Sequence, residues 1–170
     1  MDRNIKTERL TLGRIEERDS EHLIALMRDE LVKETYMLPD LPTDEGAMAL
    51  FNNIKKASER EDRYVFAVRL DDRLIGMIND TDISGREVEI GYAFSPRYHN
   101  RGYASEAARA TIDYLFSVGF DRVVAGAFAG NAASFRVMEK CGMHKIDKVD
   151  KIEYRGTVHD CFYYVIDKEK

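Results

Sequence analysis

The hydrophobic pattern of this chain changes its period twice, and that change limits the folds it can adopt. Between residues 64 and 94 apolar side chains alternate with polar ones, which predicts three β-strands over 64–70, 74–79 and 87–94. Tight turns at Asp71-Asp72 and Ser84-Gly85 join these strands into antiparallel hairpins. On both sides of this block the apolar spacing is helical, so the pattern predicts a mixture of sheet and helix.

Four helices and four further strands are expected around the hairpins. Asp19 or Ser20 can cap the first helix, and Asn131 can cap the last one, which Gly142 closes. The expected helices are 19–32, 43–58, 102–118 and 131–142, and the further strands are 7–15, 123–129, 143–149 and 160–167. The order predicts a single α+β domain over residues 1–170 with strands in mixed directions.

Composition and charge narrow the class of protein. At 44% hydrophobic and 34% charged residues, the chain can bury a core and stay soluble. The net charge is −5 without a basic stripe, which argues against a dedicated nucleic-acid binder. The longest uncharged stretch, 123–135, is shorter than the roughly 20 apolar residues of a membrane helix. The charged start at residues 1–4 predicts no signal peptide. We therefore expect neither a membrane nor a nucleic acid as a partner.

The cysteines and histidines predict no metal site. Cys141 and Cys161 fit no CxxC spacing, and the four histidines lie far apart in the chain. Both cysteines are expected to be reduced core residues, which is typical of a cytoplasmic protein.

The segment that follows the strand at 87–94 has the features of a phosphate-binding loop. A strand, a loop and a helix that begins near Gly102 leave up to four free backbone N–H groups at the helix start. The helix dipole favours an anion there, Gly102 permits close approach to the backbone, and Arg101 adds a positive charge. The alternative is that Gly102 only completes the turn and that Arg101 is solvated.

Several motifs in this order resemble one enzyme family. They are Thr7-Glu8-Arg9-Leu10, Ile75-Gly76, Glu89-Ile90-Gly91-Tyr92, Arg101-Gly102-Tyr103-Ala104-Ser105-Glu106-Ala107, Asn131-Ala132-Ala133-Ser134 and Arg155-Gly156. Together they resemble the GNAT superfamily of N-acetyltransferases, and within it the ribosomal-protein alanine acetyltransferase branch. The resemblance implies a mixed, mostly antiparallel seven-stranded sheet flanked by about four helices, and acetyl-CoA as the acetyl donor.

Carried over by position, the resemblance also implies which residues contact acetyl-CoA. The loop would hold the pyrophosphate mainly through backbone N–H groups, and the strand end would pair with the pantetheine arm. The implied residues are Tyr92, Ala93, Phe94, Asn100, Arg101, Gly102, Tyr103, Ala104, Ser105, Asn131 and Ser134. His99 stands where the superfamily pattern has Gln or Arg, and a backbone-dominated site is expected to tolerate this departure.

Acetyl transfer needs a proton for the departing thiolate and a base for the amine. Many GNAT enzymes supply that proton from a Tyr seven residues after the helix-capping Asn, but this chain has Met138 there. Ser134 is the candidate instead, because it places a hydroxyl on an otherwise apolar helix face, where the branch sets a serine against the thiol. The alternative is a serine that bonds a nearby helix carbonyl.

Glu89 is the candidate base, because the small neighbours Gly91 and Ala93 leave room for a ligand and burial would raise its pKa. A water could relay the proton, and an ion-paired or solvated carboxylate is the alternative. The acceptor amine is expected on the opposite side of the site from the cofactor. The residues expected to wall its site are Tyr36, Met37, Phe51, Tyr154 and Arg155.

The sequence therefore predicts a GNAT-family N-acetyltransferase that transfers acetyl directly in a ternary complex, since no residue stands out as an acyl carrier. The acceptor is a primary amine, either a protein N-terminus or a small molecule. Two alternatives stay open: a catalytically silent CoA-binding regulatory module, and an enzyme that uses a longer acyl-CoA. A homodimer stays open too.

Overall fold

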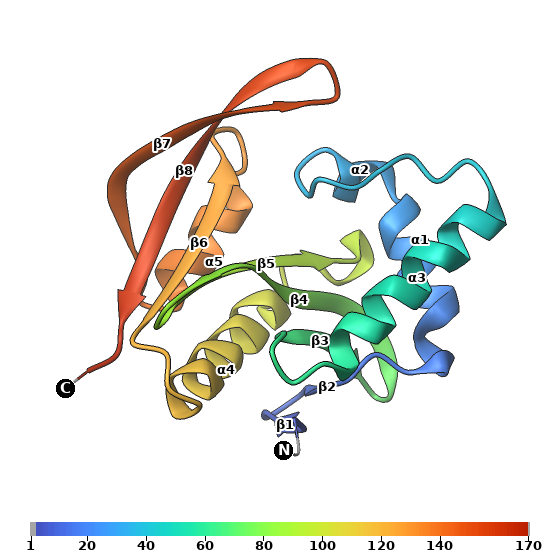
Figure 1. Ribbon diagram of the computed structural model, residues 1–170, viewed down its shortest axis with the longest axis horizontal. Helices are drawn as coiled ribbons and strands as arrows, with labels where there is room; N and C mark the ends of the chain where they lie inside the picture. Colours follow the sequence, from blue (N-terminus) through green and yellow to red (C-terminus); the bar gives the residue numbers. More distant parts are fainter. Residues whose placement is uncertain (1–2, 170) are drawn as a thin grey trace.

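One continuous sheet runs through the molecule, and the computed structural model describes it over residues 3–169 (Figure 1). Within that range the sheet has eight strands in the order β1-β2-β3-β4-β5-β6-β8-β7. All neighbours pair antiparallel except β5 and β6, which are parallel. The strands are β1 Ile5–Lys6, β2 Thr11–Gly13, β3 Val65–Leu70, β4 Arg73–Ser84, β5 Glu87–Phe94, β6 Arg122–Phe128, β7 His144–Tyr154 and β8 Thr157–Asp167.

Helices cover both faces of the sheet. Leu23 and Phe51, from α1 and α3, pack with Val65 and Met77 against one face, whereas Ile112 and other residues of α4 and α5 bury the opposite face. Among the described residues the α-helices are α1 Ser20–Arg28, α2 Glu30–Lys33, α3 Asp44–Glu59, α4 Tyr103–Ser117 and α5 Ala132–Lys140. Short 3₁₀ turns lie at Glu17–Asp19 and Pro96–Tyr98. The mixed, mostly antiparallel GNAT fold is thus confirmed.

The predicted first helix is wrong in its length and its cap. It ends at Arg28, because the backbone of Asp29 is extended and its side chain accepts the N–H groups of Leu31 and Val32 to cap the separate helix α2. Asp19 makes no capping bond to α1. Its buried carboxylate pairs with Arg69 on β3 instead, with Arg69 Nε 2.9 Å from Asp19 Oδ1.

The predicted strand at 7–15 is also wrong in its bounds, because only Thr11–Gly13 of it is strand and β1 lies just before it. The Thr7 N–H bonds the Leu10 carbonyl 2.9 Å away and turns the chain back between the two strands. Strands β4, β7 and β8 run further than predicted. Their extensions are mostly exposed, so they carry little apolar alternation to show them in the sequence. The hairpin β7–β8 turns at Arg155 and Gly156, whose φ values are 52° and 75°. Eight strands and five α-helices therefore replace the predicted seven and four over residues 3–169.

The candidate site lies where the two parallel strands in the middle of the sheet, β5 and β6, separate. Pairing between β5 and β6 runs from Glu87 with Arg122 to Ile90 with Ala125 and stops there. Beyond that point β5 stays paired with β4 through Phe94, whereas β6 continues beside β8. Figure 1 shows the two strands diverging. The second half of β5 therefore has an unpaired edge in the middle of the sheet.

Candidate active site

Two cavities adjoin the diverging strands. The helix-side cavity, of about 190 Å³, lies between the end of β5 and the first turns of α4 and α5. The sheet-side cavity, of about 410 Å³, lies among β3, β4, β5, β6, β8 and α3. Both are lined by Thr35 and Tyr36, so they meet beside the segment that follows α2. Strand β5 serves both, with Tyr92 to Phe94 in the first and Glu89 to Gly91 in the second.

The helix-side cavity is floored by the start of α4. Gly102 caps this helix with φ of 79° and no side-chain cap bond, which leaves the first-turn N–H groups without an intrahelical partner. Asn100 also has positive φ, at 59°, so the loop turns sharply just before the helix. A side chain at Gly102 would be strained, and its Cβ would lie 3.3 Å from the Arg9 guanidinium. The loop is thus shaped to receive an anion at backbone N–H groups.

A polar cluster from the start of the chain braces this loop. Arg9 Nε donates to Glu106 Oε2 at 2.7 Å, and Arg9 Nη1 donates to the Arg101 carbonyl at 3.0 Å. The guanidinium also lies over the Tyr103 ring, 4.5 Å from its centroid. Burial opposes ionisation of Glu106, but hydrogen bonds from Thr7 and Arg9 outweigh it and hold the pKa of Glu106 below its usual value. Thr7 and Arg9 of the Thr7-to-Leu10 motif therefore hold the loop and the first turn of α4 in place.

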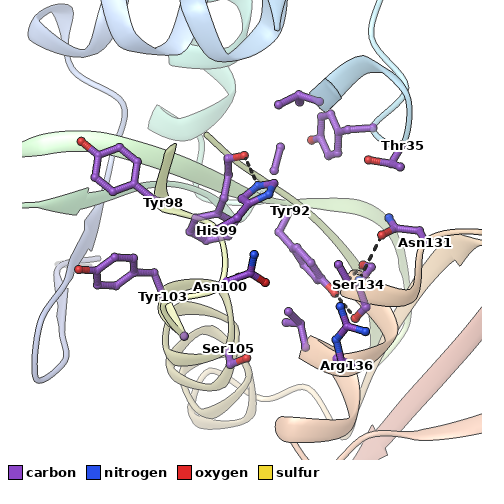
Figure 2. A pocket seen from close by; sticks show the side chains of 18 of the residues that line it. Thr35, Tyr92, Tyr98, His99, Asn100, Tyr103, Ser105, Asn131, Ser134 and Arg136 are labelled. Atoms are coloured by element: carbon purple, nitrogen blue, oxygen red, sulfur yellow. Dashed lines mark hydrogen bonds between the residues drawn. The ribbon is translucent and has the colours of Figure 1, made fainter. Parts of the chain in front are cut away.

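Two predicted loop residues lie differently from the prediction. The Arg101 side chain is not among the lining residues of the helix-side cavity, and what the residue offers is its carbonyl, held by Arg9. His99 lines the cavity but turns inward, where its Nε2 donates to the Phe94 carbonyl at 2.9 Å (Figure 2). The His99 imidazole, which stands where the family pattern has Gln or Arg, thus hydrogen-bonds the loop to the end of β5.

Ser134 lies across the helix-side cavity on α5 and is paired with a tyrosine (Figure 2). Its N–H donates to Asn131 Oδ1 at 3.2 Å, which confirms Asn131 as the helix cap. Its Oγ lies 2.8 Å from the Tyr92 hydroxyl, which also lies 3.0 Å from the Ser134 carbonyl. Burial raises the pKa of Tyr92, so the phenol stays protonated and can donate. The sequence predicts a role for the Tyr92 backbone alone, since nothing local reveals a partner 42 residues away.

The position expected to hold a tyrosine cannot take part. Met138 is 1% exposed and packs in the core among residues of the sheet, α4 and α5. A hydroxyl from β5, that of Tyr92, reaches α5 instead at Ser134, in the first turn of the helix.

Glu89 lines the sheet-side cavity. The room expected at Gly91 is taken up by neighbours, since a Cβ there would lie 3.2 Å from Thr81 Cγ2 and 3.5 Å from Tyr36 Cε2. Burial raises the pKa of Glu89, against a hydrogen bond from Thr81 and the positive charge of Lys148, while Asp82 and Asp150 raise it further. Over residues 3–169 no ion pair within 4.0 Å involves Glu89. A carboxylate with a raised pKa and no tight cation is suited to accept a proton.

The predicted acceptor wall is partly wrong. Tyr36 and Met37 line the sheet-side cavity, and Tyr36 donates a hydrogen bond to Asn79 Oδ1. Phe51 does not line it, because this side chain points into the core and is fully buried. Leu50 and Ile54 of the same helix line the cavity in its place.

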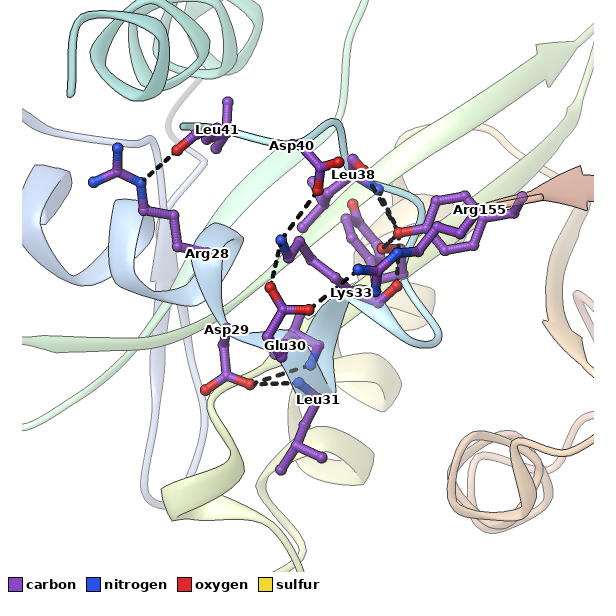
Figure 3. A network of polar contacts seen from close by, with 12 residues as sticks. Arg28, Asp29, Glu30, Leu31, Lys33, Leu38, Asp40, Leu41 and Arg155 are labelled. Carbon is purple, nitrogen blue, oxygen red and sulfur yellow. Dashed lines mark hydrogen bonds and ion pairs between the residues drawn. The ribbon is translucent and has the colours of Figure 1, made fainter. Parts of the chain in front are cut away.

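Tyr154 and Arg155 do not line either cavity but clasp the β7–β8 hairpin to the segment around α2. Tyr154 donates to the Lys33 carbonyl at 2.6 Å, and Arg155 pairs with Glu30 at 3.2 Å (Figure 3). Lys33 pairs in turn with Glu30, at 2.7 Å. Tyr154 and Arg155 therefore connect the β7–β8 hairpin to α2 rather than forming the wall of either cavity.

Neither cysteine is poised to carry an acyl group. Cys141 Sγ donates to the Ser105 carbonyl at 3.5 Å, and burial raises the pKa of Cys141 to about 11. Cys161 lines the sheet-side cavity, a position that the sequence did not reveal, and burial raises its pKa as well. Both thiols are free and stay protonated at neutral pH.

Residues 3–169 contain neither a set of metal ligands nor a membrane-spanning helix. No cluster of three or more His, Cys, Asp or Glu side chains suited to a metal ion occurs there. In the same range no helix combines the length and apolarity needed to cross a bilayer.

Known proteins are similar to this chain in both sequence and fold. Residues 9–144 match the family model of the acetyltransferase (GNAT) domain. The chain is 33% identical over 170 residues to the uncharacterized N-acetyltransferase YnaD of Bacillus subtilis, with 98% of each chain covered. It is likewise 33% identical to the crystal structure of an acetyltransferase of the GNAT family from Bacillus anthracis. The TM-score there is 0.83, over 96% of this chain and 98% of that chain.

A more distant structure is RimL, a ribosomal alpha-N-protein acetyltransferase solved in complex with coenzyme A. It is 17% identical with a TM-score of 0.86, covering 96% of this chain and 97% of that chain, which shows a shared fold.

Proposed function

We propose, from the premise that this chain belongs to the GNAT family of N-acetyltransferases, that it moves an acetyl group from acetyl-CoA directly to a primary amine. The observation that carries the proposal is that β5 lines both cavities, with different residues in each. Beyond Ile90 this strand has an unpaired edge, with Glu89 in one cavity and Tyr92 in the other. A donor and an acceptor could therefore meet beside a single strand.

In this proposal the helix-side cavity receives acetyl-CoA. The first-turn N–H groups of Tyr103, Ala104 and Ser105 are suited to the pyrophosphate, and the free edge of β5 is suited to the amide-bearing pantetheine arm. When bound, acetyl-CoA supplies an acetyl thioester. RimL, which shares the fold, was solved with coenzyme A, and this supports the assignment.

Glu89 acts as the base in this proposal. An alkyl ammonium must lose a proton before its nitrogen can attack a carbonyl, and a carboxylate with a raised pKa takes up that proton more readily at neutral pH. Glu89 accepts it directly or through one water. The amine would reach Glu89 through the sheet-side cavity that both Glu89 and Gly91 line.

Ser134 and Tyr92 hold the proton for the leaving thiolate. Their hydroxyls lie 2.8 Å apart, so Ser134 Oγ can donate its proton to the thiolate while Tyr92 replaces it. Tyr92 is then reprotonated by the proton that the attacking nitrogen releases, relayed through water. Because the Tyr92 phenol and the Ser134 hydroxyl are both on the helix-side cavity, they serve the donor side, and Glu89 serves the acceptor side.

One specific observation favours a silent CoA-binding module instead. Met138 occupies the usual proton-donor position and is buried, so the usual donor is missing. The test is to incubate the protein with acetyl-CoA and a panel of N-terminal peptides, alkyl monoamines, polyamines, amino acids and aminoglycosides, with products read by mass spectrometry.

Acetylation by the wild type that falls strongly in both Ser134→Ala and Glu89→Gln supports the enzyme and the two roles. Binding of acetyl-CoA with no acetylated amine in the panel favours the module. A larger product from longer acyl-CoA donors than from acetyl-CoA favours the longer-chain alternative.

A further inference from the structure

The sheet-side cavity has an unusual distribution of charge for a site that receives an amine. Among its lining residues, all of which the structure describes, Glu89 is the one carboxylate and Arg63 the one basic side chain. Arg63 is already satisfied, since its Nε donates to Asp80 Oδ2 at 2.6 Å. Among the lining side chains Glu89 is therefore the one charged group without an ion pair, and Lys148, Asp82 and Asp150 act on it from outside the lining.

The other polar groups at this end are also committed. Asn79 accepts from the Tyr36 hydroxyl and donates its Nδ2 to the Asp80 carbonyl at 3.0 Å. Thr81 Oγ1 lies 3.4 Å from the Glu89 carbonyl. Few side-chain donors or acceptors are left to bind hydroxyls, a carboxylate or a second ammonium of an acceptor.

Thr35, Cys161 and Tyr163 also line the cavity, and the Tyr163 hydroxyl donates to Asp150 Oδ2 at 2.8 Å. Apolar side chains form most of the remaining wall. They come from the segment after α2, from α3, and from the strands on both sides of the split, and none of them is charged. They are Met37, Leu38, Pro39, Leu50, Ile54, Ala57, Val65, Met77, Ile90, Ala127, Phe128 and Ile152. A cavity of about 410 Å³ lies within the ~300–1,000 Å³ typical of small-molecule sites.

From this arrangement we propose that the acceptor is a small monoamine whose body is uncharged and apolar, with its amine at Glu89 and its body against Leu50, Ile54 and Phe128. This inference rests on the proposed acetyl transfer and names its substrate class. A second ammonium in the apolar wall would lose its hydration without a partner, so polyamines and aminoglycosides are poor acceptors.

Hexylamine and 1,5-diaminopentane form a matched pair for the test, because their chains are equally long. They differ only at the far end, where hexylamine has a methyl group and the diamine has a second amine. Each is incubated with the protein and acetyl-CoA, kcat/KM is measured by mass spectrometry of the product, and acetyl-CoA binding is measured separately by calorimetry. We expect hexylamine to exceed the diamine by at least ~10-fold, the scale on which apolar pockets discriminate. Spermidine and kanamycin are expected to be weaker still.

A variant with a second carboxylate in the wall should reverse the preference. Leu50→Glu is expected to narrow or invert the ratio of hexylamine to diamine. Met48→Glu adds the same charge to the same helix at a residue that is 42% exposed and outside the cavity, and it should leave the ratio unchanged. The wild-type ratio stands as a test by itself if Leu50→Glu does not fold.

The outcomes separate the two proposals. Equal or faster acetylation of the diamine, spermidine or kanamycin overturns the apolar-monoamine inference and leaves the proposed acetyltransferase in place. Calorimetric binding of acetyl-CoA without acetylation of any amine overturns the proposed function, and the inference falls with it.

Discussion

Replacing Glu89 with glutamine separates catalysis from stability at one side chain. The change keeps the size of the side chain and removes its capacity to accept a proton. General bases contribute typically 10²–10⁴-fold to rate, which equals about 3–5 kcal/mol of transition-state stabilisation. We therefore expect kcat/KM for the amine to fall by that factor in Glu89→Gln. The Kd for acetyl-CoA should change by less than about twofold, because Glu89 lines the sheet-side cavity only.

The pH dependence has a defined sign. Burial raises the pKa of Glu89, so the folded protein binds this proton more tightly than the unfolded chain does. Glu89 therefore favours folding at pH below its unfolded pKa, and that contribution is lost as pH rises through the raised folded value. Glutamine avoids the buried charge, so Glu89→Gln should melt at an equal or higher temperature than the wild type at pH 7. The difference should shrink toward pH 4.

The assay is a kcat/KM–pH profile with a thermal melt of each variant. The wild type should gain activity with pH along a limb set by the raised pKa of Glu89, and the variant should lose that limb. Glu87→Gln is the matched control, since Glu87 is an exposed residue on the same strand. Activity retained in Glu89→Gln, or a loss of activity explained by a lower melting temperature, would refute the assignment of Glu89 as the base.

Three further predictions follow from contacts in the structure. Tyr92→Phe should lower kcat about 3–10-fold, as expected for one hydrogen bond to Ser134, with little change in KM for acetyl-CoA; an unchanged kcat would exclude the hydroxyl relay. Arg9→Ala should weaken acetyl-CoA binding about tenfold by calorimetry, since one charge-assisted hydrogen bond to the loop is lost; Arg9→Lys should recover part of it, and unchanged affinity would show that the loop needs no brace. Arg69→Met should leave the buried Asp19 carboxylate, which is 1% exposed, without its cation. The free energy of unfolding should fall by about 3–5 kcal/mol, and the melting temperature by about 6–20 °C. A melting temperature that calorimetry shows to change by less than about 2 °C would contradict this.

The part of the fold that the sequence predicts best is the segment that carries the cofactor side of the site. Strand β5 has the predicted bounds of 87–94, and α4 begins one residue after the predicted start at Gly102. Strong alternation, a glycine with positive φ and a continuous apolar helix face are all local signals, so they survive without knowledge of the tertiary structure. The sharp turn at Asn100, where φ is 59°, is not predicted from the sequence.

What the sequence does not reveal depends on contacts between distant residues. The apolar spacing of α3 groups Met48 with Phe51 and Ile54, yet Met48 is 42% exposed, Phe51 is fully buried, and Ile54 lines the cavity. A helical period says which residues share a side of the helix, but the position of the sheet decides which of them meet a core or a cavity. The pairing of Tyr92 with Ser134 has the same origin, since the divergence of β5 from β6 brings them together.

The measurement that tests direct acetyl transfer most directly is the intact mass of the protein after incubation with isotope-labelled acetyl-CoA, first without an amine and then with hexylamine. Because both thiols are buried with raised pKa values, we predict an unchanged protein mass in each case and a labelled acetyl group on the amine alone. A protein that gains one labelled acetyl group without amine, and loses it as the amine is added, would contradict transfer in a ternary complex and would place the acyl carrier on this chain.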